Sequence, residues 1–502
     1  MSDSKGKDFA LGSDVHVQTT SAPAGHGAHP HGPSLRRRVI SSVILLLIYV
    51  VVAHLLPRPA SIRPEGWRLL GIFLATVGGL ILQPIPGGAL VLCAITLASL
   101  FGGLTIQQAL SGFGDPTVWL VMAAFFISDA LLKTGLARRI ALIFVRAVGK
   151  SSLGVCYALS LTDMVLASVI PSNGARSGGV VLPIARSIAE LYGSHPGPTA
   201  ALLGGFLMTG VYQSICVTAA MFMTGQASNP LAAQIATDTF HYPVSLVRWM
   251  AAGLLPGLCS LAIVPLVVYR LNPPQIKHTP EASSFAGSEL KRMGPMDRGQ
   301  GIVTAVFVTV CALWVTTPLH HIDIAVSALL GSAALLITGV LKWEDVVSNR
   351  AAWDIFIWYG GLVRLGKALN DAGLTREFAR SVGSLFAEAS WITLFICALL
   401  IYFYSHYGFA SITAHILAMF PPFTAVLIAK GAPPGLAIFA FACFSNLCAG
   451  LTHYGTTPSP MFYAHHYVPF RSWWRAGFVV SLVNVAIWST VGFGWWKLIG
   501  IW

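Results

Sequence analysis

The segment that decides the fold is Pro171-Ser172-Asn173-Gly174-Ala175-Arg176-Ser177-Gly178-Gly179, a polar, glycine-rich nonapeptide with apolar sequence on both sides. Such a segment cannot cross hydrocarbon as an open loop, because its backbone N–H and C=O groups would lack hydrogen-bond partners. A re-entrant helical hairpin with this segment at its tip avoids that cost, since protein or water then surrounds the backbone. An ordinary loop at a membrane surface is the alternative.

A second segment of the same kind is Ser405-His406-Tyr407-Gly408-Phe409-Ala410-Ser411-Ile412-Thr413-Ala414-His415. Ser411 follows Ser172 by 239 residues, and three weaker matches recur in the same order at similar spacing. These pair residues 134–138 with 372–376, 225–230 with 455–460, and 248–253 with 473–477. The order indicates an internal duplication, and paired interrupted hydrophobic segments are typical of a transporter binding site.

The composition indicates an all-α polytopic membrane protein. Of the 502 residues, 55% are hydrophobic and only 10% are charged, outside the range of soluble domains. The alternating pattern of a membrane β-barrel is absent. The net charge of +12 lies mostly in loops, so we expect no nucleic-acid partner. The eight cysteines have no metal-type spacing and are interpreted as small buried hydrophobic residues.

Charge predicts the topology. Residues 1–35 form a polar tail, expected to be disordered, and Arg36-Arg37-Arg38 before the first span place it in the cytoplasm. In that tail His26, His29 and His31 could bind a metal weakly, but a solvated tail is favoured. The basic loop at 271–299 is also expected in the cytoplasm and separates the two halves. Spans are expected near 39–56, 67–83, 87–105, 116–132, 199–223, 245–269, 300–318, 322–341, 353–370, 435–455 and 476–497.

Two hairpins complete this topology, at about 152–193 and about 391–430. Apart from the first span, each half has five crossings, an odd number, plus one hairpin, so the halves are expected to be inverted repeats. The hairpin tips then approach the middle of the membrane from opposite faces. Helix breaks at 225–230 and 455–460 should meet them there, because their prolines free backbone carbonyls.

The tips and breaks carry side chains that can ligate a carboxylate or a sodium ion: Ser172, Asn173, Ser411, Thr413, Thr456 and Thr457. Back-bonding of each Ser or Thr to its own helix is the alternative. His453 precedes the second break, where it could contact an anion or only pack between helices. Arg364 and Lys367, near the end of a span, are expected to extend toward the membrane surface.

Arg176 stands out because an arginine near a hairpin tip is costly in a membrane unless it is paired or faces a ligand. Its planar guanidinium suits a carboxylate. A structural ion pair with Asp163, on the preceding arm, is an equal alternative. No nucleophile–base pair, phosphate-binding loop or metal quartet is evident, so we expect no enzyme activity, no cofactor and no bound metal.

The first-hairpin nonapeptide with Leu182-Pro183-Ile184 resembles a motif of the divalent anion/sodium symporter (DASS) family. The resemblance is to one branch of that family, the citrate/succinate, tartrate/succinate and plastid 2-oxoglutarate/malate antiporters. Sequences of this branch are also similar to the chain at residues 446–447, 451–454 and 477–497. The resemblance implies a homodimer of protomers with about eleven transmembrane helices, two hairpins, and a transport domain that slides like an elevator along a scaffold. The scaffold would comprise 36–150 and 300–390, and the transport domain 151–270 and 391–502.

Family motifs at the tips have the form Ser-Asn-Thr and bind substrate carboxylates and, in sodium-coupled members, sodium. They match Ser172-Asn173-Gly174 and Ser411-Ile412-Thr413, so a hydroxyl and an amide are lost, which argues against sodium coupling. Arg176 could supply the missing positive charge, as suits obligate exchange. We therefore expect an antiporter of C4-dicarboxylates or tricarboxylates in a bacterial inner membrane. A sodium-coupled symporter is the first alternative. A channel or an intramembrane enzyme is an alternative from a different functional class.

Overall fold

The computed structural model describes residues 34–385 and 388–502. Within them the backbone is helical, apart from turns, loops and one isolated bridge between Ser151 and His278. Nine helical segments of this part are long and apolar enough to cross a membrane, which confirms the all-α membrane fold. They are Leu35–Leu55 (α1 and the π-helical η1), Pro64–Leu82 (α2), Pro116–Lys133 (α5), Leu246–Leu271 (α12), Arg298–Val315 (α14), Trp391–Gly408 (α20 and η6), Ile412–Ala429 (α21), Pro434–Leu451 (α22 and η7) and Phe470–Leu498 (α24, η8 and α25).

Four further helices occupy expected spans but are shorter, less hydrophobic or more charged. They are Gly87–Phe101 (α3), Gly204–Met221 (α10), Ile324–Ile337 (α16) and Arg350–Asp371 (α18). Ser152–Ala167 (α7) lies where the first arm of the first hairpin was expected. Local sequence sets where many helices begin. Pro116 starts α5 behind the N-cap Asp115, whose carboxylate accepts from the Thr117 N–H at 2.8 Å. Ser151 caps α7 in the same way by accepting from the Gly154 N–H at 3.0 Å.

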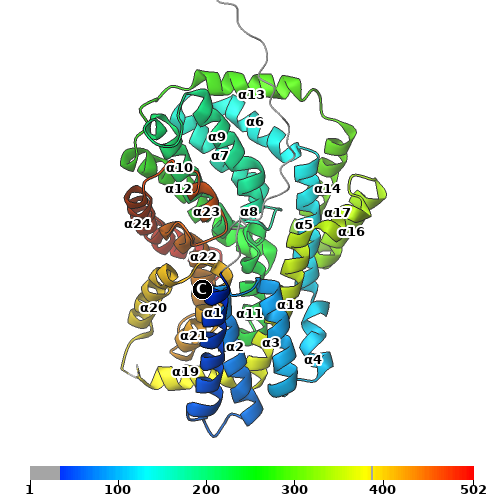
Figure 1. Ribbon diagram of the computed structural model, residues 1–502, viewed down its shortest axis with the longest axis vertical. Helices are drawn as coiled ribbons and strands as arrows, with labels where there is room; N and C mark the ends of the chain where they lie inside the picture. The colour runs from blue at the N-terminus through cyan, green and yellow to red at the C-terminus, as the bar shows by residue number, and fades with distance from the viewer. Residues whose placement is uncertain (1–33, 386–387) are drawn as a thin grey trace, which may run out of the picture.

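The helices form two groups of packed neighbours, and the larger of the two buried cores contains residues of both groups. One group packs α1 on α2, α2 on α3, α3 on α18, and α16 between α5 and α14. The other packs α7, α12 and α22 around α10, with α24 on α12 and α21 on α22. Figure 1 shows α5, α14, α16 and α18 along the right and α20, α22 and α24 along the left. The smaller core, around α2, α3 and α18, also takes in Leu231 and Leu417 from the other group.

Two helices form the centre of the second group. Every residue of α10 except Gly205 is buried, and every residue of α22 except Pro434 (Pro434–Leu447) is buried. They pack against each other, and both end in a backbone break: α10 at Met221 and α22 at Leu447. The breaks expected from the two halves are therefore held side by side in the most buried part of the molecule.

Several helices of the described chain were not expected as separate elements. The polar segment 271–299, expected as a loop, contains Pro280–Arg292 (α13), which lies on Leu136–Val148 (α6) across the top of Figure 1. The connection between the two halves is therefore partly helical. The basic stretch at 133–150 forms α6 itself. Ser228–Phe240 (α11) and Leu374–Leu385 (α19) were also missed, because neither has a long apolar run.

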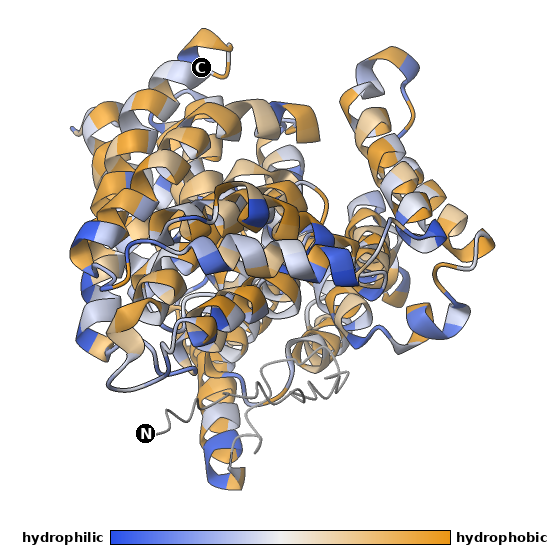
Figure 2. Cartoon of the chain, turned by 90° about the horizontal axis from the view of Figure 1, so that it is seen from above, coloured by the Kyte–Doolittle hydropathy of each residue, from blue (hydrophilic) through white to orange (hydrophobic). Residues whose placement is uncertain are grey.

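The surface of the helices is suited to lipid. Large hydrophobic side chains are exposed along α1 and at Ile337, which is 85% exposed. Figure 2 shows hydrophobic residues spread over the helices and hydrophilic residues concentrated near their ends and in loops. The cysteines are only partly as expected, since Cys93 and Cys397 are exposed on helix surfaces whereas Cys156, Cys216, Cys443 and Cys448 are buried.

Candidate functional site

The first hairpin reverses direction at Ser172. Its first arm is α7, and its second arm runs without interruption through Asn173–Arg176 (α8), Ser177–Val181 (η3) and Leu182–Leu191 (α9). The Ser172 hydroxyl accepts from the Ala175 N–H at 3.1 Å and so caps the second arm. Ser172 is half-buried at this tip, whereas Asn173 is buried.

Arg176 is completely buried and bound to protein groups. Its Nε donates to Asp163 Oδ1 at 2.8 Å. Its Nη1 donates to two carbonyl oxygens, those of Ile170 (2.7 Å) and Gly225 (2.8 Å). Nη2 lies 3.4 Å from the second oxygen of Asp163, which also accepts from the Thr218 hydroxyl. Four of the five guanidinium N–H donors are thus used. Of the two roles considered for Arg176, the structural pair with Asp163 is the arrangement present.

The second hairpin repeats this plan. Its first arm is Trp391–Ser405 (α20), its tip includes His406–Gly408 (η6), and its second arm is α21. The Ser411 hydroxyl caps α21 by accepting from the Ala414 N–H at 3.4 Å. Ser411 and Thr413 are half-buried, whereas the Ile412 side chain is buried. Ile412 therefore fills apolar space at the position where the family motif has an asparagine.

The two helix breaks are joined by a pair of asparagines. After α10 the chain passes through Met223–Gly225 (η5) to Asn229, whose Nδ2 donates to the carbonyls of Ala219 (2.8 Å) and Phe222 (2.9 Å). Asn446, near the end of α22, donates its own Nδ2 to Asn229 Oδ1 at 2.8 Å. The sequence did not single out either residue as part of the site. Their positions at corresponding breaks were the available signal.

The first tip meets the second break directly. Asn173 Nδ2 donates to Thr456 Oγ1 at 3.0 Å, and both side chains are buried. A Cβ placed on Gly174 would lie 2.8 Å from Thr457 Cγ2, so only glycine fits there without movement. Thr457 itself is exposed. Four of the expected site residues, from the first tip and the second break, are therefore brought together.

Each break also receives a basic side chain from the hairpin of its own half. Arg176 donates to the Gly225 carbonyl, and His406 Nε2 lies 2.9 Å from the Gly455 carbonyl, where it acts as the donor. The second tip is therefore tied to the second break through His406. None of the hydrogen bonds among the described residues joins Ser411 or Thr413 to Ser172 or Asn173.

Three further residues have defined surroundings. His453 lies in an aromatic cluster, where its Nδ1 accepts from Trp474 Nε1 at 3.3 Å and its ring lies 4.7 Å from that of Tyr463. Arg364 is 9% exposed, with Nη1 3.5 Å from Asp371, so the expectation that it extends to the surface was wrong. Lys367 is exposed, as expected.

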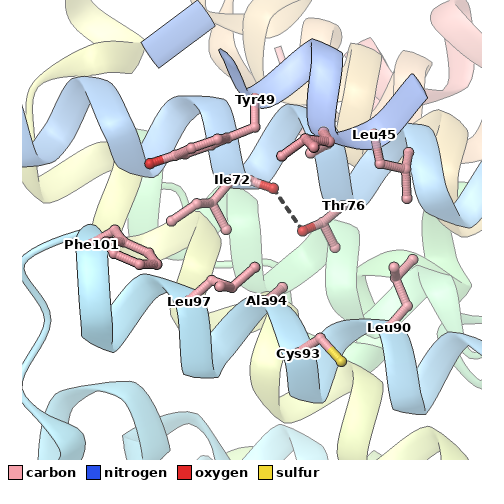
Figure 3. A pocket seen from close by; sticks show the side chains of 11 residues that line it. Leu45, Tyr49, Ile72, Thr76, Leu90, Cys93, Ala94, Leu97 and Phe101 are labelled. Atoms are coloured by element: carbon pink, nitrogen blue, oxygen red, sulfur yellow. Dashed lines mark hydrogen bonds between the residues drawn. The ribbon is translucent and has the colours of Figure 1, made fainter. Parts of the chain in front are cut away.

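An apolar pocket elsewhere has a different character. It lies among α1, α2 and α3, and its lining includes Leu45, Tyr49, Leu90, Leu97 and Phe101 (Figure 3). The Thr76 hydroxyl in this lining is bonded at 2.7 Å to the carbonyl of Ile72 in its own helix. The lining is almost wholly apolar and carries no positive charge, so the pocket suits an acyl chain of the surrounding lipid better than a carboxylate.

Comparison with known proteins decides the family. The family model described as "Sodium:sulfate symporter transmembrane region" matches residues 37–502. This chain belongs to that family. The DASS resemblance of the hairpin motifs is thereby confirmed. Because family members and relatives are transporters, the chain is a multi-pass membrane transporter and not an enzyme.

Relatives of this DASS protein cover nearly its whole length. The putative malate transporter YflS of Bacillus subtilis is 42% identical over 464 residues, covering 92% of this chain and 97% of YflS. The chloroplastic dicarboxylate transporter 1 of Arabidopsis thaliana is 38% identical over 499 residues, covering 98% and 90%. The crystal structure of the Alcanivorax borkumensis YdaH transporter aligns with a TM-score of 0.52 at 13% identity, over 92% and 98% of the chains, and supports the fold alone.

Proposed function

We propose that this DASS protein exchanges C4-dicarboxylates or tricarboxylates across a bacterial inner membrane, without sodium, by an elevator movement. Succinate, malate, tartrate, 2-oxoglutarate and citrate are the candidate substrates. YflS is named a malate transporter and the Arabidopsis relative a dicarboxylate transporter, which supports this class. The segments 133–150 and 271–299, which contain α6 and α13, are rich in basic residues and would face the cytoplasm, as would the N-terminus.

The observation that carries the proposal is the meeting of the first tip with the second break. Asn173 and Thr456 are hydrogen-bonded and buried, while the neighbouring Ser172 and Thr457 remain accessible. Hydroxyl and amide groups in such a place can donate to a carboxylate. The second tip offers Ser411 and Thr413, both half-buried, for the other carboxylate. His453 and its aromatic cluster would form one border of the site.

Sodium independence is supported by what occupies the breaks. The carbonyls of Gly225 and Gly455 are the kind of oxygen ligand that sodium would use, but they accept from Arg176 and His406 instead. Gly174 and Ile412 supply no side-chain oxygen at the two tips. Without a coupling cation, the gradient of a second carboxylate has to drive transport. Because Asp163 neutralises Arg176, Arg176 serves here by holding the first tip rather than by adding net charge.

The two helix groups suggest the moving parts. The group around α2, α3, α5 and α18 would be the scaffold of a homodimer, and the group around α10 and α22, with both hairpins, would be the transport domain. In each half the chain passes through several packed helices, then a hairpin, then a broken helix. This repeated order fits inverted repeats. Movement of the second group would carry the tips and breaks together.

Competition in proteoliposomes tests the substrate class. Vesicles containing the purified protein are preloaded with unlabelled succinate, and uptake of labelled succinate is measured against external competitors. Excess malate, tartrate, 2-oxoglutarate or citrate is expected to reduce uptake, whereas sulfate and acetate are not. Uptake that does not saturate, or that sulfate alone inhibits, would contradict the proposal. The first of these outcomes would indicate a channel.

The sodium-coupled symporter stays as the second candidate, because the family model is named for sodium symport. It requires oxygen ligands at the breaks other than the two glycine carbonyls. Side-chain oxygens near the second break include the hydroxyls of Thr452, Thr456, Thr457 and Ser459. Sodium-driven uptake into empty vesicles distinguishes it from exchange.

A further inference from the structure

Two buried histidines and a cysteine gather behind the second hairpin tip. His406 belongs to η6, His415 to α21, and Cys448 begins Cys448–Leu451 (η7), the turn after α22. A ring nitrogen of each histidine and the cysteine sulfur all lie within 4.8 Å of one another, and all three side chains are 0% exposed. The function proposed above uses only the Nε2–H of His406, which donates to the Gly455 carbonyl, and leaves the other donor groups without a role.

The hydrogen bonds of the histidines fix their orientation. His406 Nε2 faces the Gly455 carbonyl at 2.9 Å, and His415 Nε2 faces the Tyr402 carbonyl at 2.9 Å. Because a carbonyl only accepts, each Nε2 carries the proton and each Nδ1 has a free lone pair. Both Nδ1 atoms are buried without a hydrogen-bond partner among the described residues. An imidazole anchored through one nitrogen to a carbonyl is the usual arrangement of a metal-binding histidine.

We propose that His406, His415 and Cys448 form a buried site for a borderline or soft metal ion, with Zn²⁺ as the probe. Nitrogen and sulfur donors suit zinc or copper(I), whereas sodium and magnesium require oxygen ligands. Tetrahedral Zn²⁺ with bonds of about 2.0–2.3 Å separates its ligand atoms by roughly 3.3–3.8 Å, so the cluster has to contract by about 1 Å. The fourth position is left for water.

Binding exchanges a proton for the metal without redox chemistry. The S–H bond of Cys448, which now donates to the Ser445 carbonyl at 3.2 Å, breaks, the proton leaves to water, and an S–metal bond forms. The ion would tie both arms of the second hairpin to the second break. Since Ser411 and Thr456 lie on those segments, an occupied site holds them in one arrangement and slows transport.

Metal content tests the site directly. Because the three side chains are fully buried, zinc is supplied during expression, and the full chain is purified through a tag that contains no histidine. Wild type is expected to retain one more equivalent of zinc than Cys448→Ser. Cys443→Ser is the matched control, since Cys443 is also buried on α22 but lies outside the cluster. The histidines of the N-terminal tail are the same in all variants and cancel in the comparison.

Growth in cobalt gives a second readout. A thiolate-to-cobalt charge-transfer absorption is expected in wild type and in Cys443→Ser, and its loss is expected in Cys448→Ser and His415→Gln. If wild type holds no more zinc than Cys448→Ser, the proposal is overturned. Persistence of the thiolate band in Cys448→Ser would also overturn it, because the band would then come from another cysteine.

Discussion

At the scale of residues, the surroundings of Arg176 are set by Asp163. The sequence placed both residues on the first hairpin and could not choose between an ion pair and a ligand-facing arginine. The choice depends on two carbonyls, Ile170 and Gly225, and on the Thr218 hydroxyl. Gly225 and Thr218 lie on other elements, and no local pattern predicts where their oxygens point.

Breaking this pair from one side is expected to cost stability. Arg176→Gln leaves the buried Asp163 carboxylate without its partner, which typically costs about 3–5 kcal/mol. The midpoint of thermal unfolding in detergent should fall strongly, and the double variant with Asp163→Asn should recover most of the loss. Arg186→Gln is the control, because its pair with Glu190 is exposed and contributes about 0.5 kcal/mol or less. Equal midpoints for the two arginine variants would contradict the assigned role.

Gly174 tests the contact between the first tip and the second break. In Gly174→Ala the new methyl group would lie 2.8 Å from Thr457 Cγ2, and overpacking of this kind costs about 1–3 kcal/mol. Exchange is expected to fall about tenfold while the amount of folded protein is unchanged. Thr457→Ser removes Cγ2 but keeps the hydroxyl, so adding it to Gly174→Ala should restore transport. A lack of rescue would mean that the two segments do not touch during transport.

The site residues differ in whether the sequence alone could identify them. Asn173, Gly174, Thr456 and Thr457 were expected, because a polar tip and a proline-rich break inside apolar sequence are visible locally. The Asn229–Asn446 link was missed, because it joins residues 217 positions apart, although both residues lie in segments that the sequence had singled out. The sequence also could not show that the described residues of the two tips share no direct hydrogen bond.

At the scale of elements, hydrophobic length predicted the long spans and both hairpins to within a few residues, since burial in lipid demands such runs. It failed for α11, where Gln234, Thr237 and Asp238 interrupt the apolar pattern and burial comes from neighbouring helices. α13 could have been found. Pro280 and Glu281 are typical of a helix start, and Lys291 and Arg292 of a helix end.

The docking of α13 is expected to weaken in acid. Tyr192, just after α9, donates to the Glu281 carboxylate, and this hydrogen bond lowers the pKa of Glu281 below its usual 4.5. A lowered pKa in the folded state means that the contribution is present above pH 4.5 and is lost as the pH falls through the lowered value. Hydrogen exchange of α13 should therefore accelerate in that acidic range, relative to α6.

Tyr192→Phe provides the control for that experiment. It removes the hydroxyl that lowers the pKa of Glu281 and leaves the rest of the ring in place. The variant should exchange faster near neutral pH and show a smaller change on acidification. An unchanged pH dependence in the variant would contradict the assignment of the effect to Glu281.

At the scale of the molecule, the duplication seen in the sequence corresponds to a duplicated order of elements around α10 and α22. Each half delivers a basic side chain from its hairpin to the glycine carbonyl of its own break: Arg176 to Gly225 and His406 to Gly455. This repetition could not be read from the sequence, since an arginine before the first break and a histidine before the second are not an evident match. It is the main structural reason to expect transport without sodium.

The most direct test of that central claim is the sodium dependence of carboxylate uptake. Labelled malate uptake is measured in proteoliposomes that are empty or preloaded with unlabelled malate, each with choline or with an inward sodium gradient. The account predicts uptake only into preloaded vesicles, at the same rate in choline and in sodium. Sodium-driven accumulation in empty vesicles would contradict it, and would require sodium ligands other than the two glycine carbonyls held by Arg176 and His406.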